Sequence, residues 1–464
     1  MFERPRSGER AVLVRLGFGA QVDPEDLQEF TQLAVSAGAQ PVATVTGRRD
    51  RPDPRFFMGS GKADEVRAAA VDNAADLILV DHALSPSQER NLEKLTGRRV
   101  LDRNSLILDI FAQRARSFEG KLEVELAQLK HIASRLVRGW THLERQKGGI
   151  GMRGPGETQL ETDRRLIGQR VRVLTRRLEK IQQQRATGRQ LRAGIPVPSL
   201  ALVGYTNAGK STLFSSLTGA DAYVADQLFA TLDPTVRRIT LPGGTAVVAA
   251  DTVGFIRELP HELVAAFQST LTEAREATLL LHVVDASDAR RDDHIAQVDA
   301  VLAEIGAEQI PQILVYNKID RLGFEPGGPM GEPVGPAGQP RVERDADGRA
   351  TGVWISAQKR LGLDLLAGAI AERIARFARV ARLRVPAAAG ALRSRLYAAK
   401  AVREERSADD GSSELLVELP DVELLALART PGVQILEVPG PDMPCAPADA
   451  YLKSTAVSSA TSRS

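Results

Sequence analysis

One eight-residue string constrains the fold of this chain more than any other feature. It follows the apolar run SLALV at 199–203 and opens the helical pattern STLFSSL at 211–217. Its members are Gly204, Tyr205, Thr206, Asn207, Ala208, Gly209, Lys210 and Ser211. The spacing G-x-x-x-x-G-K-S between a strand and a helix predicts a loop whose amides cradle a phosphate. A chance glycine turn before a helix is the alternative, and the flanking strand and helix argue against it.

Each part of this loop has a chemical role. Glycine lets the backbone wrap closely around a phosphate, and the helix N-terminus adds partial positive charge. We expect Lys210 to reach the β- and γ-phosphates and the Ser211 hydroxyl to ligate Mg²⁺.

Two later strings indicate which base is bound. A carboxylate at Asp320 can accept both the N1–H and the exocyclic amine of guanine, a pair of donors that adenine lacks. A backbone amide of the second string could donate to guanine O6. The strings are Asn317, Lys318, Ile319 and Asp320 after QILVY, and Ser356, Ala357 and Gln358 after VWI. The sequence therefore favours GTP and GDP over ATP.

Two segments between the loop and the base-binding strings are predicted to sense the γ-phosphate. Asp251 closes the apolar run TAVVAA and is placed to complete the Mg²⁺ shell, while the Gly254 amide could contact the γ-phosphate. We favour Thr231 over Thr235 as the threonine ligand of Mg²⁺. The nucleotide-binding candidates here are Phe229, Ala230, Thr231, Leu232, Asp233, Asp251, Thr252, Val253 and Gly254.

The residue after Gly254 is Phe255, where many GTPases carry a glutamine that orients the attacking water. We therefore predict slow intrinsic hydrolysis. Asn207 could hold a K⁺ ion, which would supply the positive charge that an arginine finger supplies in other GTPases. A loop asparagine that only bonds its neighbours is equally consistent with the sequence. The catalytic candidates are Lys210, Asn207 and Gly254.

The remaining sequence divides the 464 residues into several parts. Short apolar runs alternate with helical patterns over 1–116, which predicts a small parallel α/β domain. Residues 194–382 return to that alternation and predict a doubly wound parallel sheet, with ligands at the carboxyl ends of its strands. Thirteen of residues 323–352 are Gly or Pro, which predicts a flexible surface insertion there.

Residues 117–193 have a different pattern. Two heptad seams flank the glycine- and proline-rich string 147–161, and they predict an antiparallel helical hairpin, with a shared coiled-coil dimer as the less favoured reading. The seams are Leu122, Leu126, Leu129, Ala133, Leu136, Trp140 and Leu143, and then Ile167, Val171, Leu174, Leu178 and Ile181.

Residues 391–445 predict a small C-terminal domain with strands at 415–419 and 433–438, and residues 446–464 a disordered tail. The lone Cys445 excludes a disulfide framework and a cysteine metal site. No apolar run approaches a membrane span, and no signal-type N-terminus is present. We expect a cytoplasmic monomer.

The hairpin is strongly basic. Residues 130–192 contain sixteen Lys or Arg against five Asp or Glu. Such a stripe suits a phosphate backbone, and Arg153 at the tip could stack on RNA, although a solvated helix face is the alternative. The predicted stripe is Arg164, Arg165, Arg170, Arg172, Arg176, Arg177, Lys180 and Arg185.

Taken together, the motifs resemble one family. GYTNAGKSTLF (204–214), LFATLDPT (228–235), DTVGFI (251–256) and GGIGMRGPGETQLETDRR (148–165) look like the HflX family of GTPases, as do MGSGKADEV (58–66) and DRNSLILDIFAQRA (102–115). The resemblance implies a translation-linked, Mg²⁺-dependent GTPase that binds the large ribosomal subunit and its RNA, and that splits, rescues or recycles ribosomes.

Other readings stay open. An RNA-binding GTPase that assists ribosome assembly, or a scaffold whose GTPase domain only gates assembly, fits the same residues. A P-loop kinase or ATPase is disfavoured by NKID. The string Gly59-Ser60-Gly61-Lys62 predicts a turn and helix start in preference to a second nucleotide site, because Phe56 stands where a phosphate loop needs glycine.

Overall fold

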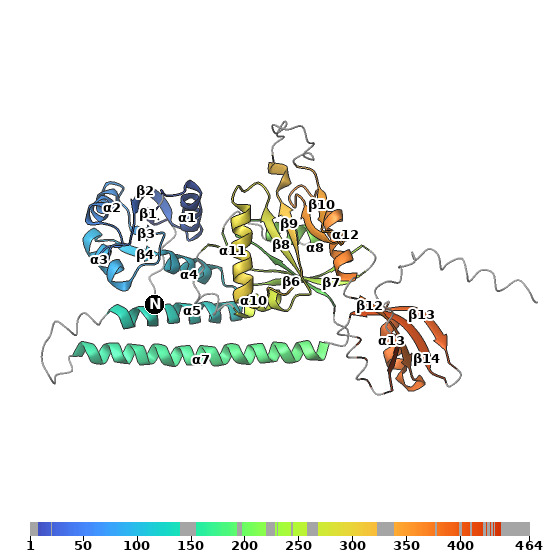
Figure 1. Cartoon of the computed structure of the whole chain (residues 1–464). Coiled ribbons are helices and arrows are strands. Elements are labelled where there is room, and N and C mark those ends of the chain that lie inside the picture. The colour runs from blue at the N-terminus through green and yellow to red at the C-terminus, as the bar shows by residue number, and fades with distance from the viewer. Residues whose placement is uncertain are drawn as a thin grey trace, which may run out of the picture. The chain divides into compact units, whose positions relative to one another are not determined.

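The chain has two compact units. The computed structural model describes residues 8–19, 21–139, 155–192, 197–219, 228–229, 231–242, 245–257, 268–322, 338–375, 378–398, 401–408, 411–420, 424, 427, 430 and 432–437. The first unit comprises residues 1–193 and 197–371, and the second comprises 194–196 and 372–464. The multidomain α/β class predicted from the sequence is confirmed (Figure 1).

The first unit begins with a four-stranded parallel sheet in the order β2-β1-β3-β4. Its elements are β1 (Arg10–Phe18), α1 (Pro24–Ser36), β2 (Gln40–Arg49), α2 (Ser60–Asp72), β3 (Leu77–Val80), α3 (Pro86–Thr96), β4 (Arg99–Asp102) and α4 (Arg103–Arg114). The GSGK string lies at the start of α2, with Gly59 as its N-cap, so the predicted helix start is confirmed.

Both faces of this sheet are covered, which explains its uninterrupted apolar strands. Ala11 and Leu13 pack on one face with Phe30 of α1, whereas Val12 and Val14 belong to a second core on the opposite face. Local signals fix the helix starts. The Asp23 side chain accepts from the Glu25 amide before α1.

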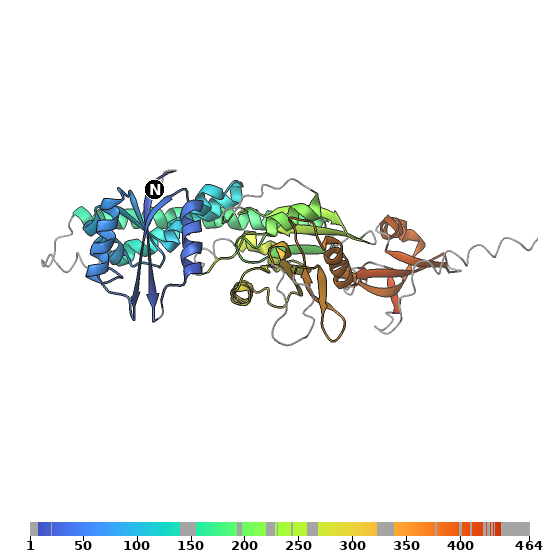
Figure 2. The same ribbon diagram turned by 90° about the horizontal axis from the view of Figure 1, so that it is seen from above.

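The two heptad seams form the predicted helices, α5 (Phe118–Gly139) and α7 (Pro155–Arg192), which lie side by side in Figures 1 and 2. Their shared core contains Leu122, Leu126, Leu174 and Leu178. Residues 155–161, which we predicted to lie in the connecting loop, are helical. Proline is tolerated at the first helical position, because the amide it lacks has no partner there. Trp140, Leu143 and Arg153 fall outside the described residues.

A seven-stranded sheet follows, in the order β10-β11-β9-β8-β5-β7-β6. All neighbouring pairs are parallel except β6 with β7 and β10 with β11. The elements are β5 (Ser199–Val203), α8 (Lys210–Thr218), β6 (Thr235–Thr240), β7 (Ala246–Asp251), α10 (Gln268–Arg275), β8 (Leu279–Asp285), α11 (Arg291–Glu304), β9 (Gln312–Asn317), η1 (Ile319–Arg321), β10 (Arg341–Arg344), β11 (Ala350–Trp354) and α12 (Leu363–Ala375).

The structure corrects the predicted insertion at 323–352. Residues 323–337 lie outside the described residues, but β10 pairs with β11 and extends the sheet. Ala350 is fully buried. The Gly and Pro residues are concentrated before Arg341. Because the prediction used the Gly and Pro content of the whole segment, it missed the strand-forming strings RVER and ATGVW.

The second unit is an antiparallel sheet in the order β13-β14-β12-β15. Its elements are β12 (Ala378–Val385), η2 (Ala387–Ala389), α13 (Gly390–Ala398), β13 (Val402–Ser407), β14 (Ser413–Pro420) and β15 (Gln434–Glu437). Because β12 pairs with both β14 and β15, this unit includes residues up to 382 that we assigned to the preceding domain. The predicted tail at 446–464 lies outside the described residues.

Candidate functional site

The string 204–211 connects β5 to α8, as its spacing predicted. Gly204 has φ +146°, and a Cβ there would lie 2.2 Å from the Val283 carbonyl oxygen of β8. Gly209 has φ +93°, and a Cβ would lie 2.3 Å from Asn317 Nδ2. Only glycine fits these two positions, because both backbone conformation and space exclude a side chain.

The segment after Asp251 is joined to this loop through its backbone. The Thr206 amide donates to the Phe255 carbonyl over 2.7 Å, and the Phe255 amide donates to the Gly204 carbonyl over 3.1 Å. The Phe255 side chain is 2% exposed and lies in the core. It therefore offers no polar group to an attacking water, as predicted from its residue type.

Lys210 is buried beneath the loop. Its Nζ donates to the carbonyl oxygens of Gly204 and Tyr205 over 3.0 and 2.7 Å. Burial lowers the pKa of Lys210 to about 8, although the Asp251 carboxylate opposes this effect. A Cβ on Gly254 would lie 3.0 Å from Nζ, which puts the Gly254 backbone beside the lysine, as its predicted role requires.

The three predicted Mg²⁺ ligands meet in one cluster. The Ser211 and Thr231 hydroxyls both donate to Asp251 Oδ2, over 2.8 and 2.9 Å, and lie 2.8 Å from each other. Asp251 Oδ1 is buried and has no hydrogen-bond partner in the described part of the chain, and burial raises the pKa of this carboxyl group. A buried, unsatisfied carboxylate oxygen beside two hydroxyl oxygens fits a hard cation such as Mg²⁺.

The base-recognition strings also converge. Asn317 Nδ2 donates to the Ala208 carbonyl over 3.0 Å, and Asn317 Oδ1 accepts from the Ala357 amide over 2.9 Å. Asn317 thus ties the phosphate loop to the second string. Ser356 Oγ donates to Asp320 Oδ1 over 2.5 Å and so orients the predicted guanine-binding carboxylate.

Other members of the two strings have different surroundings. Lys318 pairs with Asp285 at 2.7 Å, and Gln358 is exposed. Ile319 is fully buried in a small core, so its side chain is structural. The prediction that a backbone amide of 356–358 donates to guanine O6 named no single residue, and the Ala357 amide is already bonded to Asn317.

Several predicted nucleotide contacts have side chains that face elsewhere. Phe229 packs against Phe111 of α4 with ring centroids 4.6 Å apart, and Leu232 lies in the same core. Asp233 bonds to the start of α5. The chemistry of a switch loop does not reveal which side chains turn inward, and a nucleotide contact through the backbone of these three residues stays a prediction. Ala230 lies outside the described residues.

Two residues next to Asp251 are also structural. The Thr252 hydroxyl donates to the Leu202 carbonyl of β5 over 2.6 Å, and Val253 lies in the core. Their side chains therefore fix the end of β7 against β5 instead of contacting a ligand. Asp251 and Gly254 stay the predicted functional members of the DTVG string, and a nucleotide contact through the backbone of Thr252 or Val253 stays a prediction as well.

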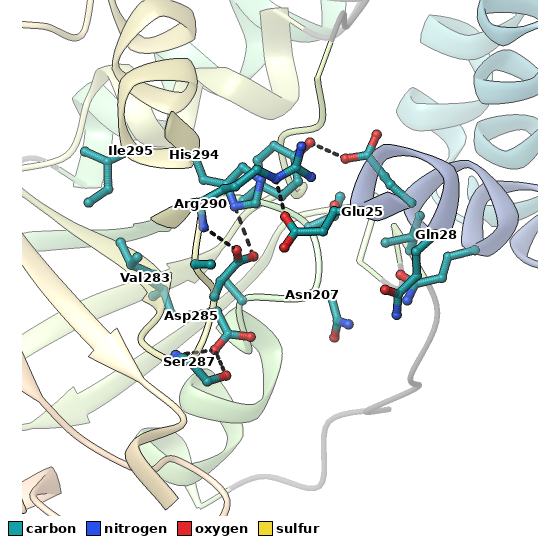
Figure 3. Close-up of a pocket in the computed structure, with 18 of the residues that line it drawn as sticks. Glu25, Gln28, Asn207, Val283, Asp285, Ser287, Arg290, His294 and Ile295 are labelled. Atoms are coloured by element: carbon teal, nitrogen blue, oxygen red, sulfur yellow. Dashed lines mark hydrogen bonds and ion pairs between the residues drawn. The ribbon is translucent and has the colours of Figure 1, made fainter. Parts of the chain in front are cut away.

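A cavity of about 340 Å³ lies beside the phosphate loop. Its walls come from Tyr205–Ala208, from the β8–α11 connection and from α1. Figure 3 shows Glu25 and Gln28 of α1 on one side, with Asn207 and Asp285 on the other. Thr206 lines this cavity, and its Oγ1 is buried without a hydrogen-bond partner among the described residues, so it is suited to a phosphate oxygen.

The sequence analysis missed a network of charged residues to which Glu29 and Arg290, both in the cavity lining, belong. Asp26 of α1 pairs with Arg15, Arg257 and Arg290 at 2.5, 2.8 and 2.6 Å. The Tyr205 hydroxyl donates to Glu29 and accepts from the Arg257 amide, and the Tyr205 ring stacks on His294. These partners lie up to 264 residues apart, so no local pattern could have predicted them.

The predicted basic stripe lies on α7. Arg164, Arg165, Arg172, Arg176, Arg177 and Lys180 are exposed, whereas Leu174 and Leu178 face α5. Arg170 is exposed and pairs with Glu125 of α5 at 2.7 Å. The side chain of Arg185 lies outside the described ones. No described helix combines the length and apolar character needed to cross a membrane.

Comparisons with known proteins cover most of the chain. Models named GTP-binding GTPase N-terminal, GTP-binding GTPase middle region and 50S ribosome-binding GTPase match residues 24–112, 114–192 and 199–318. The GTPase HflX of Escherichia coli K12 is 54% identical over 430 residues, covering 92% of this chain and 98% of the relative. The GTPase HflX of Caldanaerobacter subterraneus subsp. tengcongensis is 46% identical over 374 residues, covering 81% and 82%. A solved GTP-binding protein from Sulfolobus solfataricus, bound to GDP, aligns at 24% identity with a TM-score of 0.41, covering 79% and 99%.

Proposed function

We propose, from the premise that this chain belongs to the HflX family of GTPases, that it acts on the large ribosomal subunit and couples GTP binding and hydrolysis to ribosome splitting, rescue or recycling. The observation that carries the proposal is the exposed basic stripe on α7, which is made of arginines and Lys180. The family model over 199–318, named 50S ribosome-binding GTPase, supports the same partner.

The basic stripe suits ribosomal RNA because the apolar face of α7 packs on α5, which leaves the charged side chains exposed. Leu174 and Leu178 pack on α5, so the charged side chains project away from that contact. Cations on a projecting helix bind a phosphate backbone with an affinity that falls steeply with salt. A merely solvated helix face would show no such dependence.

Mg²⁺ is part of the proposal. Ser211, Thr231 and Asp251 would hold the ion, which would supply positive charge to the phosphates of the nucleotide. Lys210 would move from the carbonyl oxygens of the loop to the phosphates, while the Gly254 amide would contact the γ-phosphate. Asp320 would select guanine.

Hydrolysis without a partner is expected to be slow. Phe255 is buried and apolar, so the chain supplies no glutamine to orient water. We expect turnover by the purified protein below about 1 s⁻¹, as in other GTPases that depend on a partner. The decisive measurement is GTP turnover with and without large ribosomal subunits. Stimulation supports the proposal, and an unchanged rate overturns it.

Charge reversal in the basic stripe provides a second test. The triple variant Arg172→Glu, Arg176→Glu and Arg177→Glu is expected to lose binding to large subunits while nucleotide affinity is retained. A matched control replaces Arg341, Arg344 and Arg349 by Glu. Arg341 and Arg344 lie in β10, and Arg349 lies just before β11. Equal binding by both variants would indicate that the stripe is only a solvated face.

K⁺ is a further candidate cofactor. Asn207 is exposed at the edge of the phosphate loop, with φ +60°. Its amide oxygen could hold the ion beside the phosphates and supply positive charge. We expect faster turnover in K⁺ than in Na⁺, and expect the difference to vanish in Asn207→Ala. Equal rates in the two salts with the unmodified protein would exclude this role.

The alternative is an RNA-binding GTPase that assists assembly of the subunit. The basic stripe on α7 favours this function as well, but the particle that is bound would be an immature subunit in place of an intact ribosome. If the protein with GTP dissociates intact ribosomes in a light-scattering assay, the splitting role is supported. Binding to immature particles without dissociation would favour assembly.

A further inference from the structure

Asp233 connects the cluster of predicted Mg²⁺ ligands, Ser211, Thr231 and Asp251, to the helical hairpin. It lies two residues after Thr231, in the segment that leads into β6. Its Oδ2 accepts hydrogen bonds from the Arg116 and Ser117 amides, both over 2.8 Å, and its Oδ1 accepts from Ser117 Oγ over 2.5 Å. All three donors immediately precede helix α5.

These bonds form part of the helix cap. Ser117 Oγ accepts a hydrogen bond from the Gly120 amide over 2.9 Å, and its hydroxyl donates one to Asp233. The negative carboxylate also lies at the positive end of the helix, where it is stabilised by the unpaired amides. Asp233 therefore completes the start of α5 from a different domain.

Gly120 makes this approach possible. It lies in the first turn of α5, and a Cβ there would be 2.3 Å from Asp233 Oδ1. Alanine would be the better helix former, so propensity does not explain the glycine. The space it leaves is filled by the Asp233 carboxylate. The residue choice at 120 and the acid at 233 thus belong to one contact.

The segment is fixed at two other points. The Leu228 amide donates to Ser36 Oγ of α1 over 3.1 Å, and Phe229 packs on Phe111 of α4. Thr231 lies between these anchors and Asp233. Two residues span at most about 7 Å, so Thr231 stays within that distance of each anchor unless the anchor itself moves.

We infer that Asp233 is a positioning residue: by binding the start of α5 it holds Thr231 at the Mg²⁺ cluster, and it thereby couples the nucleotide state to the hairpin. This inference rests on the proposed role of Thr231 as a ligand of nucleotide-bound Mg²⁺. Because coupling is reciprocal, a ligand that shifts α5 changes the affinity for GTP by the same factor.

The test compares two glycine-to-alanine variants within helices. Gly120→Ala favours the helix but excludes the Asp233 carboxylate. Gly168→Ala is the matched control, since a Cβ at 168 in α7 would meet no described atom within 4 Å. Asp233→Asn keeps the side-chain size but removes the charge. Affinities for a non-hydrolysable GTP analogue and for GDP are measured with Mg²⁺ on the full chain.

We expect Gly120→Ala and Asp233→Asn to bind the GTP analogue roughly 5- to 20-fold more weakly, which lies within the usual range of such couplings, while GDP affinity changes less than about twofold. Gly168→Ala should match the unmodified protein. The inference is overturned if Gly120→Ala behaves like Gly168→Ala, or if the affinities for both nucleotides fall together.

Thr231→Ala separates this inference from the proposed function. If Thr231→Ala loses its preference for the GTP analogue and the Asp233 and Gly120 variants do not, only the positioning role fails. If Thr231→Ala retains its preference, the proposed Mg²⁺ ligand itself is wrong, and the positioning role fails with it.

Discussion

Thr231 donates its hydroxyl to Asp251 Oδ2 over 2.9 Å, although the two residues belong to different segments around the phosphate loop. The contact brings a threonine from a switch segment to the end of β7. Ser211 donates to the same oxygen, so three segments converge on one carboxylate. Their convergence leads to the first prediction.

Asp251→Asn is expected to lower Mg²⁺-dependent GTP turnover by roughly 100-fold or more, because a metal ion contributes several kcal/mol to the transition state. The neutral amide binds a cation less well than a carboxylate does. Turnover is measured across a range of Mg²⁺ concentrations, and the variant should need far more Mg²⁺. A normal rate at ordinary Mg²⁺ would show that Asp251 is not the metal carboxylate.

Asp320→Asn should change which base is bound. A carboxylate accepts from the two donors of guanine, whereas an asparagine amide can donate to the carbonyl oxygen that xanthine carries in place of the guanine amine. We expect GTP affinity to fall by roughly 100-fold or more, with a gain in XTP affinity. Competition binding with GTP and XTP checks this. Asp364→Asn, an exposed acid in the first turn of α12, is the control.

The functional strings were predictable because their chemistry is local. A phosphate loop, an NKID string and a DTVG string each need a fixed set of residues between a strand and a turn. Gly204 and Gly209 show why, since neighbouring groups leave no room for a Cβ at either position. The strand–helix alternation of both parallel sheets was predictable for the same reason.

The side-chain contacts were hardest to predict where a residue has two possible partners. Asp233 is an acid in a switch segment, and nothing in its neighbourhood distinguishes a nucleotide contact from a helix cap 116 residues away. Phe229 and Leu232 are similar cases. The strand β10 was missed because the Gly and Pro content was averaged over the whole of 323–352.

Asp26→Asn is expected to destabilise the first unit by on the order of 1–3 kcal/mol, because three arginines lose a shared charge in a partly buried site. The control is Asp64→Asn, whose pair with Arg67 is solvent-exposed and should contribute little. Chemical denaturation of the full chain, followed by circular dichroism of the backbone, measures the stability of both variants. Equal midpoints for the two variants would contradict the prediction.

The same contact has a defined pH dependence. Burial raises the pKa of Asp26, but the hydrogen bond from Arg290 and the charges of Arg15 and Arg257 outweigh it, so the pKa lies below its ordinary value. The stabilisation is present above the unfolded pKa of about 3.9 and is lost as the pH falls through the lower folded value. Asp26→Asn should abolish this acid-sensitive part.

His282 of β8 gives a separate pH response at milder acidity. Its side chain is 1% exposed, and the Asp299 carboxylate lies 3.8 Å away. Burial lowers the pKa of His282 to about 4, against about 6.5 in an unfolded chain. Between these values the unfolded state binds more protons, so stability is present above about pH 6.5 and is lost as the pH falls toward 4.

From pH 7 to pH 5 this one histidine is expected to remove about 2 kcal/mol of stability. His282→Asn cannot take up the proton, so its denaturation midpoint should fall less than that of the unmodified protein over the same interval. His294→Asn is the control, because His294 is partly exposed on α11 and stacks on Tyr205. If His282→Asn and the unmodified protein lose stability in parallel, the buried neutral state of His282 is wrong.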